Sequence, residues 1–247
     1  MFRPRVTTRT LFALTILTTA ILAGACAAPP EEAIVQRFSR ASQMRDNTTL
    51  VNFAIVEFDP RTQGTVSSFE IASVSEERVE PLRIGEFTKA LADAQEAEQA
   101  FTDRKKVYQD ANWPAINRVL KAENTKAPVT GKDLAVQAEW NKWREETASH
   151  AKEISVARAR LSGAHAVPDV SLGNLPPEQV PNLAKAEGQI ASKDVTINAQ
   201  VRLPDGKTEA KTLVVTLQQA RLKSASPEGL VGRWIIGAIT DAGAAKP

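Results

Sequence analysis

The chain has 247 residues but only one cysteine, Cys26, and two histidines, His150 and His165. A single thiol excludes any disulfide within the chain, so its stability has to come from packing alone. Zinc is held in proteins mainly by cysteine and histidine, and too few of them are present to build such a site. An aspartate-rich loop of the EF-hand type is also missing. We therefore expect no metal site.

Motifs that bind nucleotides or carry a catalytic nucleophile are absent from the sequence. Gly131-Lys132 lacks the upstream glycine of a P-loop, and no Gly-x-Gly-x-x-Gly segment occurs. The Gly-x-Ser-x-Gly elbow of serine hydrolases is missing as well. These absences predict a protein that has no catalytic residue and no cofactor, and that is not an enzyme.

The overall charge gives no support for a nucleic-acid partner. The formal net charge is +2, but three arginines, Arg3, Arg5 and Arg9, lie in an N-terminal leader. Removing these three from the 31 basic residues leaves 28, against 29 acidic residues. Without the leader the chain is therefore close to neutral, and we expect no nucleic-acid partner.

The N-terminus has the three parts of a secretory signal. The arginines form a basic head, Leu11–Leu22 is an apolar stretch broken only by threonines, and small residues follow. This stretch is shorter than the ~20 residues that a membrane-spanning helix needs, so an uncleaved anchor is not expected.

The segment Ala23-Gly24-Ala25-Cys26 resembles the lipobox that ends the signal peptides of bacterial lipoproteins. The resemblance implies that residues 1–25 are a signal peptide, that the chain is cut before Cys26, and that the Cys26 sulfur carries a diacylglycerol. In this family an alanine such as Ala27 after the cysteine favours the outer membrane when a cell has two membranes. The alternative is ordinary secretion, with cleavage between residues 25 and 28.

Periodicity and turn residues divide the rest of the chain into helices, strands and loops. Residues 26–30 form a short tether after the leader. We expect helices over 31–45, 86–121 and 132–162, strands over 65–79, 195–203, 208–222 and 230–239, a loop over 163–188, and a disordered tail over 242–247. Trp113-Pro114 should kink the second helix, and Gly163 should end the third.

Residues 86–162 predict an antiparallel helical hairpin, because two long helices follow each other across a short turn. Its second helix has a heptad seam with alternating steps of four and three. The seam residues are Val136, Trp140, Trp143, Thr147, His150, Ile154, Ala157 and Leu161. With the turn near residue 127, Phe101 should face Ile154 and Lys105 should face His150. Stacking of Trp140 and Trp143 on the sugar rings of peptidoglycan is the alternative to packing in the seam.

The regions on either side of the hairpin, residues 31–85 and 189–241, predict one α+β body, in which an N-terminal helix packs on an antiparallel meander sheet. This layout resembles the nuclear transport factor 2-like and cystatin-like cone folds. The resemblance rests on Val35-x-x-Phe38-x-x-Ala41, on the meander and on Gly232-Arg233-Trp234-x-Ile236. It implies that the hairpin is an insertion and that a pocket exists between helix and sheet. The pocket would be lined by Phe38, Phe53, Phe69 and Trp234.

Together these features predict a non-enzymatic lipoprotein of the cell envelope, exported and held to the membrane through Cys26. The hairpin would serve as a binding or scaffold arm toward an envelope protein, or else as a dimerisation element. A small-ligand carrier or enzyme of the cone-fold type is an alternative, and a dry pocket of ~300 Å³ or more would favour it. A plain secreted helical adaptor is another, favoured by a filled core and an exposed apolar stripe on the hairpin.

Overall fold

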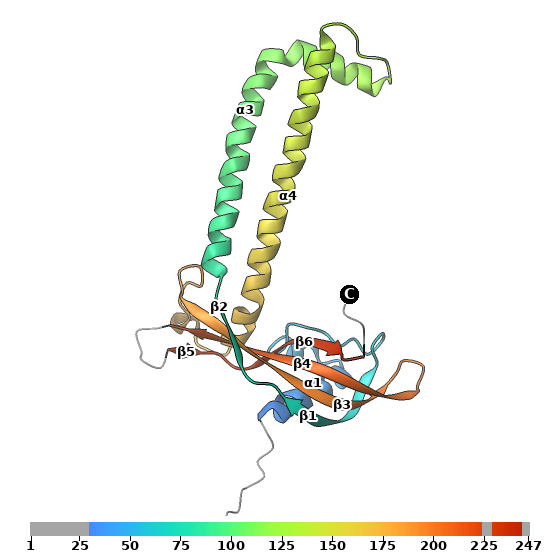
Figure 1. Cartoon of the computed structure of the whole chain (residues 1–247), viewed down its shortest axis with the longest axis vertical. Coiled ribbons are helices and arrows are strands. Elements are labelled where there is room, and N and C mark those ends of the chain that lie inside the picture. The colour runs from blue at the N-terminus through green and yellow to red at the C-terminus, as the bar shows by residue number, and fades with distance from the viewer. Residues whose placement is uncertain (1–29, 224–228, 244–247) are drawn as a thin grey trace, which may run out of the picture.

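The structure, a computed structural model, describes residues 30–223 and 229–243. The leader, Cys26 and the tail from residue 244 onward lie outside the described residues. The described part is an α+β fold, as the sequence predicts. It consists of an antiparallel sheet, an N-terminal helix and two long helices that pack together (Figure 1).

The helices are α1 (Pro30–Met44), α2 (Asn47–Leu50), α3 (Ile84–Asn124), α4 (Asp133–Leu172) and the short 3-10 helix η1 (Pro177–Gln179). Helix α1 matches its prediction within one residue. It starts with proline and has acidic side chains in its first turn, both of which suit a helix N-terminus. The short helix α2 is capped by Asp46, whose carboxylate accepts a hydrogen bond from the Thr49 backbone N–H at 3.0 Å.

The strands are β1 (Thr65–Val74), β2 (Arg78–Pro81), β3 (Gly188–Arg202), β4 (Thr208–Leu222), β5 (Leu230–Val231) and β6 (Ile235–Asp241). β3 and β4 form the centre of the sheet and are paired along their full length. Both β1 and β2 pair with β3, whereas β5 and β6 pair with β4. The predicted turn between β3 and β4 is confirmed, and Gly206 there has a φ of 87°, which glycine adopts without strain.

Two of the predicted strands are each divided in the structure. The prediction for residues 65–79 becomes β1 and β2. At Ser75 the backbone N–H still donates to the Asp194 carbonyl, but the Asp194 N–H donates to the Ser75 hydroxyl at 2.8 Å in place of its carbonyl, which interrupts the ladder. The prediction for residues 230–239 becomes β5 and β6. There the Arg233 backbone N–H donates to the Ser171 carbonyl of α4 at 2.8 Å instead of to a neighbouring strand.

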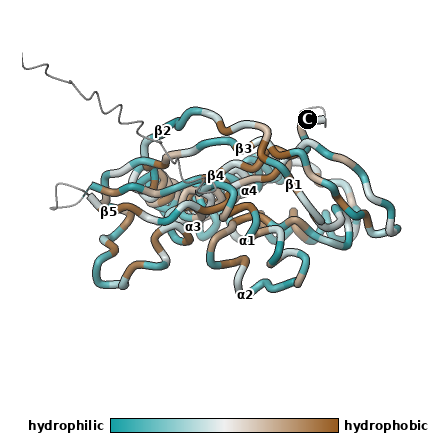
Figure 2. The backbone as a smooth tube through the Cα atoms, turned by 90° about the horizontal axis from the view of Figure 1, so that it is seen from below, coloured by the Kyte–Doolittle hydropathy of each residue, from teal (hydrophilic) through white to brown (hydrophobic). Residues whose placement is uncertain are grey.

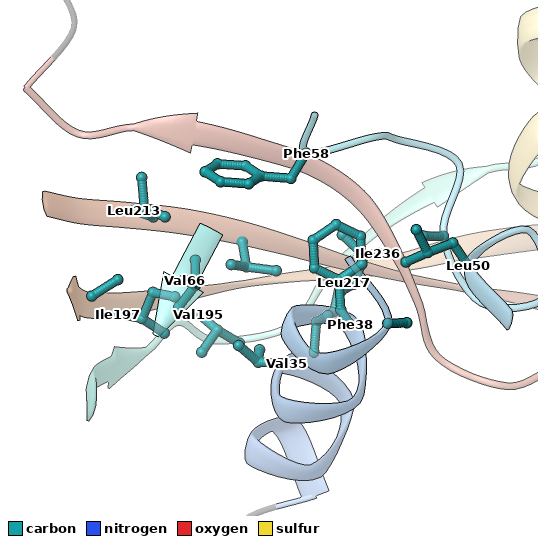
Figure 3. Close-up of a cluster of buried hydrophobic side chains, with 14 of the residues drawn as sticks. Val35, Phe38, Leu50, Phe58, Val66, Val195, Ile197, Leu213, Leu217 and Ile236 are labelled. Carbon is teal, nitrogen blue, oxygen red and sulfur yellow. The ribbon is translucent and has the colours of Figure 1, made fainter. Parts of the chain in front are cut away.

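The first hydrophobic core lies between α1 and the sheet. Successive side chains of a strand point to opposite faces, so Val195, Ile197 and Val215 share one face, and all three are buried. Val35 and Phe38 of α1 belong to the same cluster. Figure 3 shows Val35 and Phe38 of the helix meeting Val195 and Ile197 of the sheet. Burial of these side chains holds α1 on this face of the sheet.

The second core lies on the opposite face of the same two strands. Ala220 and Leu222 of β4 differ by an odd number of positions from Val215, so they point away from α1. They are buried in a cluster with Leu172, the last residue of α4. The hairpin therefore joins the sheet on the face that α1 does not cover. Figure 1 shows the hairpin and α1 on opposite sides of the sheet, and Figure 2 looks from the α1 side along the hairpin.

The prediction that Gly163 ends the last long helix, and that residues 163–188 are a loop, is wrong for the first part of that range. Helix α4 continues to Leu172, and no neighbouring atom lies within 4 Å of the position that a Gly163 Cβ would occupy. A glycine inside a helix costs about 0.5–1 kcal/mol. Val167 and Leu172 are buried in the last turns of α4, near the sheet, and the free energy gained by burying them outweighs this cost.

The first turn of α1 is fixed to the sheet by an ion pair between Glu31 and Lys193 of β3, both largely buried. Burial alone would raise the pKa of Glu31, but the hydrogen bond and the positive charge of Lys193 outweigh it, so the pKa is lowered. The Lys193 ammonium also lies 4.5 Å from the centre of the Trp234 ring. The start of α1 is thus held at a defined place on the body.

Candidate functional site: the helical hairpin

The hairpin is attached to the sheet through a tight joint around Ser171 at the end of α4. The Ser171 hydroxyl donates to the Arg233 carbonyl at 2.7 Å and accepts from the Ala220 backbone N–H at 3.0 Å. The Arg233 guanidinium donates to the Val170 carbonyl at 3.1 Å. Gly232 lies so close that a Cβ there would be 2.3 Å from the Ser171 hydroxyl oxygen. These contacts fix the direction in which the hairpin leaves the sheet.

This joint differs from the sequence prediction, in which Ser171 falls in a loop over residues 163–188. One available signal was the apolar spacing, which continues past Gly163 from Leu161 to Ala164 and Val167 with helical steps of three residues. That spacing predicts a longer helix whose last turns are buried, although it does not indicate what they contact.

The middle of the hairpin is held together by a cluster of aromatic rings. Phe101 of α3 is only 2% exposed. Its ring centre lies 5.5 Å from that of Trp143 and 4.8 Å from that of His150. Tyr108 lies 5.6 Å from Trp143, and the pKa of its hydroxyl is raised, first by burial and then by the charge of Glu139. The structure thus places Trp143 and His150 inside the seam.

Trp140 lies one turn away and is covered by cations. The Lys105 ammonium lies 5.5 Å, and the Arg144 guanidinium 5.9 Å, from the centre of the Trp140 ring. The indole nitrogens of Trp140 and Trp143 are buried and have no hydrogen-bond partner among the described residues. Both tryptophans therefore supply packing surface to the seam. Their faces are not presented together on the outside of the hairpin, as stacking on a sugar chain would require.

The other predicted seam residues lie along α4 toward its two ends. Val136, Ile154 and Leu161 are each partly buried. Two helices alone cannot enclose a seam as completely as a larger bundle, so most seam side chains keep some exposure. The predicted seam therefore lies along the hairpin. In the middle of the hairpin, Phe101 is the side chain of α3 that is buried against it.

The expected register of the hairpin is wrong by about one helical turn. Phe101 faces His150 rather than Ile154, and the Lys105 ammonium donates to the Thr147 hydroxyl at 2.8 Å rather than facing His150. The cause is the bend of α3 near Pro114, visible in Figure 1, after which its last turns pass across the far end of α4. The residues of α3 after Pro114 thus belong to the connection between the two helices, which is longer than a simple turn.

Two paired arginines hold this far end in place. Arg118 of α3 forms a bidentate ion pair with Asp133 of α4, in which two guanidinium nitrogens lie 2.7 and 2.8 Å from the two carboxylate oxygens. Arg144 of α4 does the same with Glu123 of α3 at 2.7 and 3.1 Å. These hydrogen bonds lower the pKa of Asp133 and of Glu123. Such surface pairs stabilise by little, so they contribute mainly to the orientation of the end of the hairpin.

The outer surface of the hairpin exposes several large apolar side chains. Val107 is 71% exposed, Trp113 is 49% exposed and Leu134 is 52% exposed. An open groove of about 340 Å³ also lies between the helices beside Phe101 and Lys105. Apolar side chains gathered in one patch mark surfaces that contact other proteins, whereas single ones are ordinary on any protein surface.

The residues that the cone-fold resemblance implies as a pocket lie in the first core. Phe38 and Phe53 are buried there, and Phe69 and Trp234 are partly buried against them. Packed side chains occupy the space around Phe38, Phe53 and Trp234, whereas Phe69 also lines an open, largely polar groove of about 340 Å³ between α1 and β1. The four residues are thus brought together, but as part of a hydrophobic core.

The part of the chain that the structure describes has neither a cluster of metal ligands nor a membrane-spanning helix. Within residues 30–223 and 229–243, no group of three or more histidine, cysteine or acidic side chains is placed to hold a metal ion. In the same part of the chain, none of the helices combines the length and the apolar content that crossing a bilayer requires.

Comparison with protein-family models, curated proteins and solved structures gives no match to this chain. The resemblances to lipoproteins and to the cone folds therefore stay predictions.

Proposed function

We propose that this protein is a non-enzymatic scaffold of the cell envelope that is anchored by a lipid on Cys26 and contacts another envelope protein with its hairpin. One observation carries the proposal. Helix α1, which begins four residues after Cys26, covers one face of the sheet, while the hairpin leaves from the other. At 1.5 Å per residue, the 40 residues of α4 give the arm a reach of about 60 Å.

Two features of the described residues support an arm rather than a carrier. The core between α1 and the sheet is packed with side chains, and the groove of about 340 Å³ beside it, between α1 and β1, is open and largely polar rather than a dry pocket. The hairpin, in contrast, has its own aromatic cluster and a rigid joint, and its exposed apolar residues lie far from the body. A fixed direction and an exposed surface are what a contact arm requires.

The anchor is tested by the state of the N-terminus. We expect the wild-type protein from cell membranes to enter the detergent phase, and its first peptide to begin at Cys26 with the mass of attached acyl chains. The Cys26→Ser variant should keep its leader and gain no acyl mass. Mass spectrometry of both proteins checks this. A wild-type protein in the aqueous phase, starting between residues 25 and 28 without acyl mass, would mean ordinary secretion.

The arm is tested by site-specific photo-crosslinking in cells. A photoreactive residue at Val107 or Val156, both exposed on the hairpin, should give one discrete crosslinked product. The same residue at Glu209, which is exposed on β4 of the body, should give none, and it serves as the matched control. The gel pattern of each variant is the measurement. Crosslinks at Glu209 alone would show that the body, not the hairpin, makes the contact.

A further inference from the structure

We propose that the outward face of α1, together with the end of α2, binds anionic lipid headgroups, so that the body rests on the membrane surface beside its anchor. The inference rests on the proposed function, which brings this face next to the bilayer that holds Cys26. It goes further by assigning a second membrane contact to the folded body and by giving the hairpin a direction.

The outward face of α1 carries a short basic stripe. Val35 and Phe38 are buried against the sheet. Steps of three and four residues then place Arg37, Arg40 and Met44 together on the opposite side of the helix, where all three are exposed. Arginines in line with an apolar side chain are typical of helices that lie on an anionic membrane surface.

The arginines of this stripe have no acidic partner. None of the ion pairs within residues 30–223 and 229–243 involves Arg37, Arg40 or Arg45. Glu31 is paired with a lysine of the sheet. Glu32 and Arg40 both line the groove between α1 and β1, but no ion pair joins them. The stripe therefore carries positive charge that no described carboxylate neutralises.

A second arginine increases the positive charge beside Arg37. The pKa of Arg233 is lowered, first by burial and then by the positive charge of Arg37. The Arg37 guanidinium lies 4.8 Å from the centre of the Phe53 ring, which holds it near the body rather than free in solvent.

Apolar side chains flank the arginines at the end of α1. Met44 is 73% exposed, and Val51, which follows α2, is 64% exposed. Both are among the most exposed large apolar residues of the described chain. A headgroup layer accepts such side chains at its boundary with the acyl chains, whereas an acidic protein surface has no equivalent layer. This combination favours a bilayer as the occupant.

The length of the chain before α1 keeps this face near the membrane. Pro30 follows Cys26 by four residues, which span at most about 14 Å. Electrostatic attraction between exposed charges falls off over ~8 Å at physiological salt, so a longer tether would weaken it. The hairpin leaves from the other face of the sheet (Figures 1 and 2). Seating α1 on the bilayer therefore points the arm away from it.

The test uses residues 27–247 without leader or lipid, which keeps every described element of the fold. We expect this chain to float with vesicles that contain phosphatidylglycerol, to stay free with pure phosphatidylcholine, and to be released by high salt. Each arginine near an anionic surface contributes about fivefold to binding. The Arg37→Gln/Arg40→Gln variant should therefore bind about 25-fold more weakly.

Arg158→Gln/Arg160→Gln is the control, because it removes the same charge from exposed positions of α4, and its binding should match that of the wild type. Thermal unfolding of all three proteins checks that they are folded. Absence of vesicle binding, equal weakening by both variants, or arginine-dependent binding only to an acidic polypeptide would overturn the inference. The vesicle experiment uses a chain without lipid, so absence of vesicle binding would not contradict the lipid anchor at Cys26. Equally, absence of acyl mass at Cys26 would not contradict binding of the lipid-free chain to vesicles.

Discussion

Replacing Gly232 with valine should lower the free energy of unfolding by about 3 kcal/mol, a loss typical of overpacking a close contact. The new Cβ would lie 2.3 Å from the Ser171 hydroxyl oxygen and 2.7 Å from its carbonyl oxygen. Relief requires the end of α4 to move away from Gly232, which would break the hydrogen bonds that the Ser171 hydroxyl makes with the Arg233 carbonyl and the Ala220 backbone N–H. For a chain of this size the melting temperature should fall by about 10 °C.

Gly163→Ala is the matched control in the same helix. Nothing lies within 4 Å of the Cβ position at Gly163, so alanine adds no clash there. Alanine also favours the helix by about 0.5–1 kcal/mol over glycine, and the variant should therefore melt slightly above the wild type. Calorimetry or circular dichroism measures both variants. A Gly232→Val protein that melts within ~2 °C of the wild type would show that α4 and Gly232 do not meet as described.

The second large effect is expected from Phe101→Ala in the middle of the hairpin. Phe101 is buried between Trp143 and His150, and removing such a ring costs about 3–5 kcal/mol. It belongs to neither core of the body. The loss should therefore appear as local opening of α3 and α4, while the sheet stays folded. Hydrogen exchange should show faster exchange in the hairpin and unchanged protection in β3 and β4.

Val107→Ala serves as the comparison for Phe101→Ala. Val107 is on the same helix but 71% exposed, so its truncation should change stability by less than about 0.5 kcal/mol. If Phe101→Ala instead accelerated exchange in β3 and β4 as much as in the hairpin, the hairpin and the body would unfold as one unit, and the separation of their cores would be wrong.

Most of the fold could be predicted from local patterns. The alternation of apolar and polar residues around Val195 and the turn at Gly206 depend on neighbours in sequence. They predicted the bounds of β4 and the second half of β3, but β3 begins at Gly188, seven residues before the predicted strand. The limits of other elements depend on contacts between distant parts of the chain. Gly163 has a local preference for ending a helix, but the buried turns beyond it decide the outcome. The same holds for Gly232-Arg233, which bond to α4 and divide a strand.

The hairpin could be predicted in kind but not in detail. The heptad spacing indicated which side chains of α4, such as Trp143 and His150, line the seam. The residues that they face depend on how α3 bends at Pro114, and no spacing in the sequence determines that angle. Ser171 has no distinctive sequence signal, because a serine near a helix end is common. Only its position against Gly232 gives it a role.

The two ends of the hairpin are connected to adjacent strands of the sheet. Strand β2 precedes α3, β3 follows α4, and the two strands are paired, with Pro81 opposite Gln189. The sheet therefore sets where the hairpin begins but not how long it is. Adding or removing seven residues in each helix would keep the same seam and change the span by about 10 Å. The fold thus combines a constant platform with a spacer adjustable in steps, and related chains with longer or shorter spacers would bridge gaps of different widths.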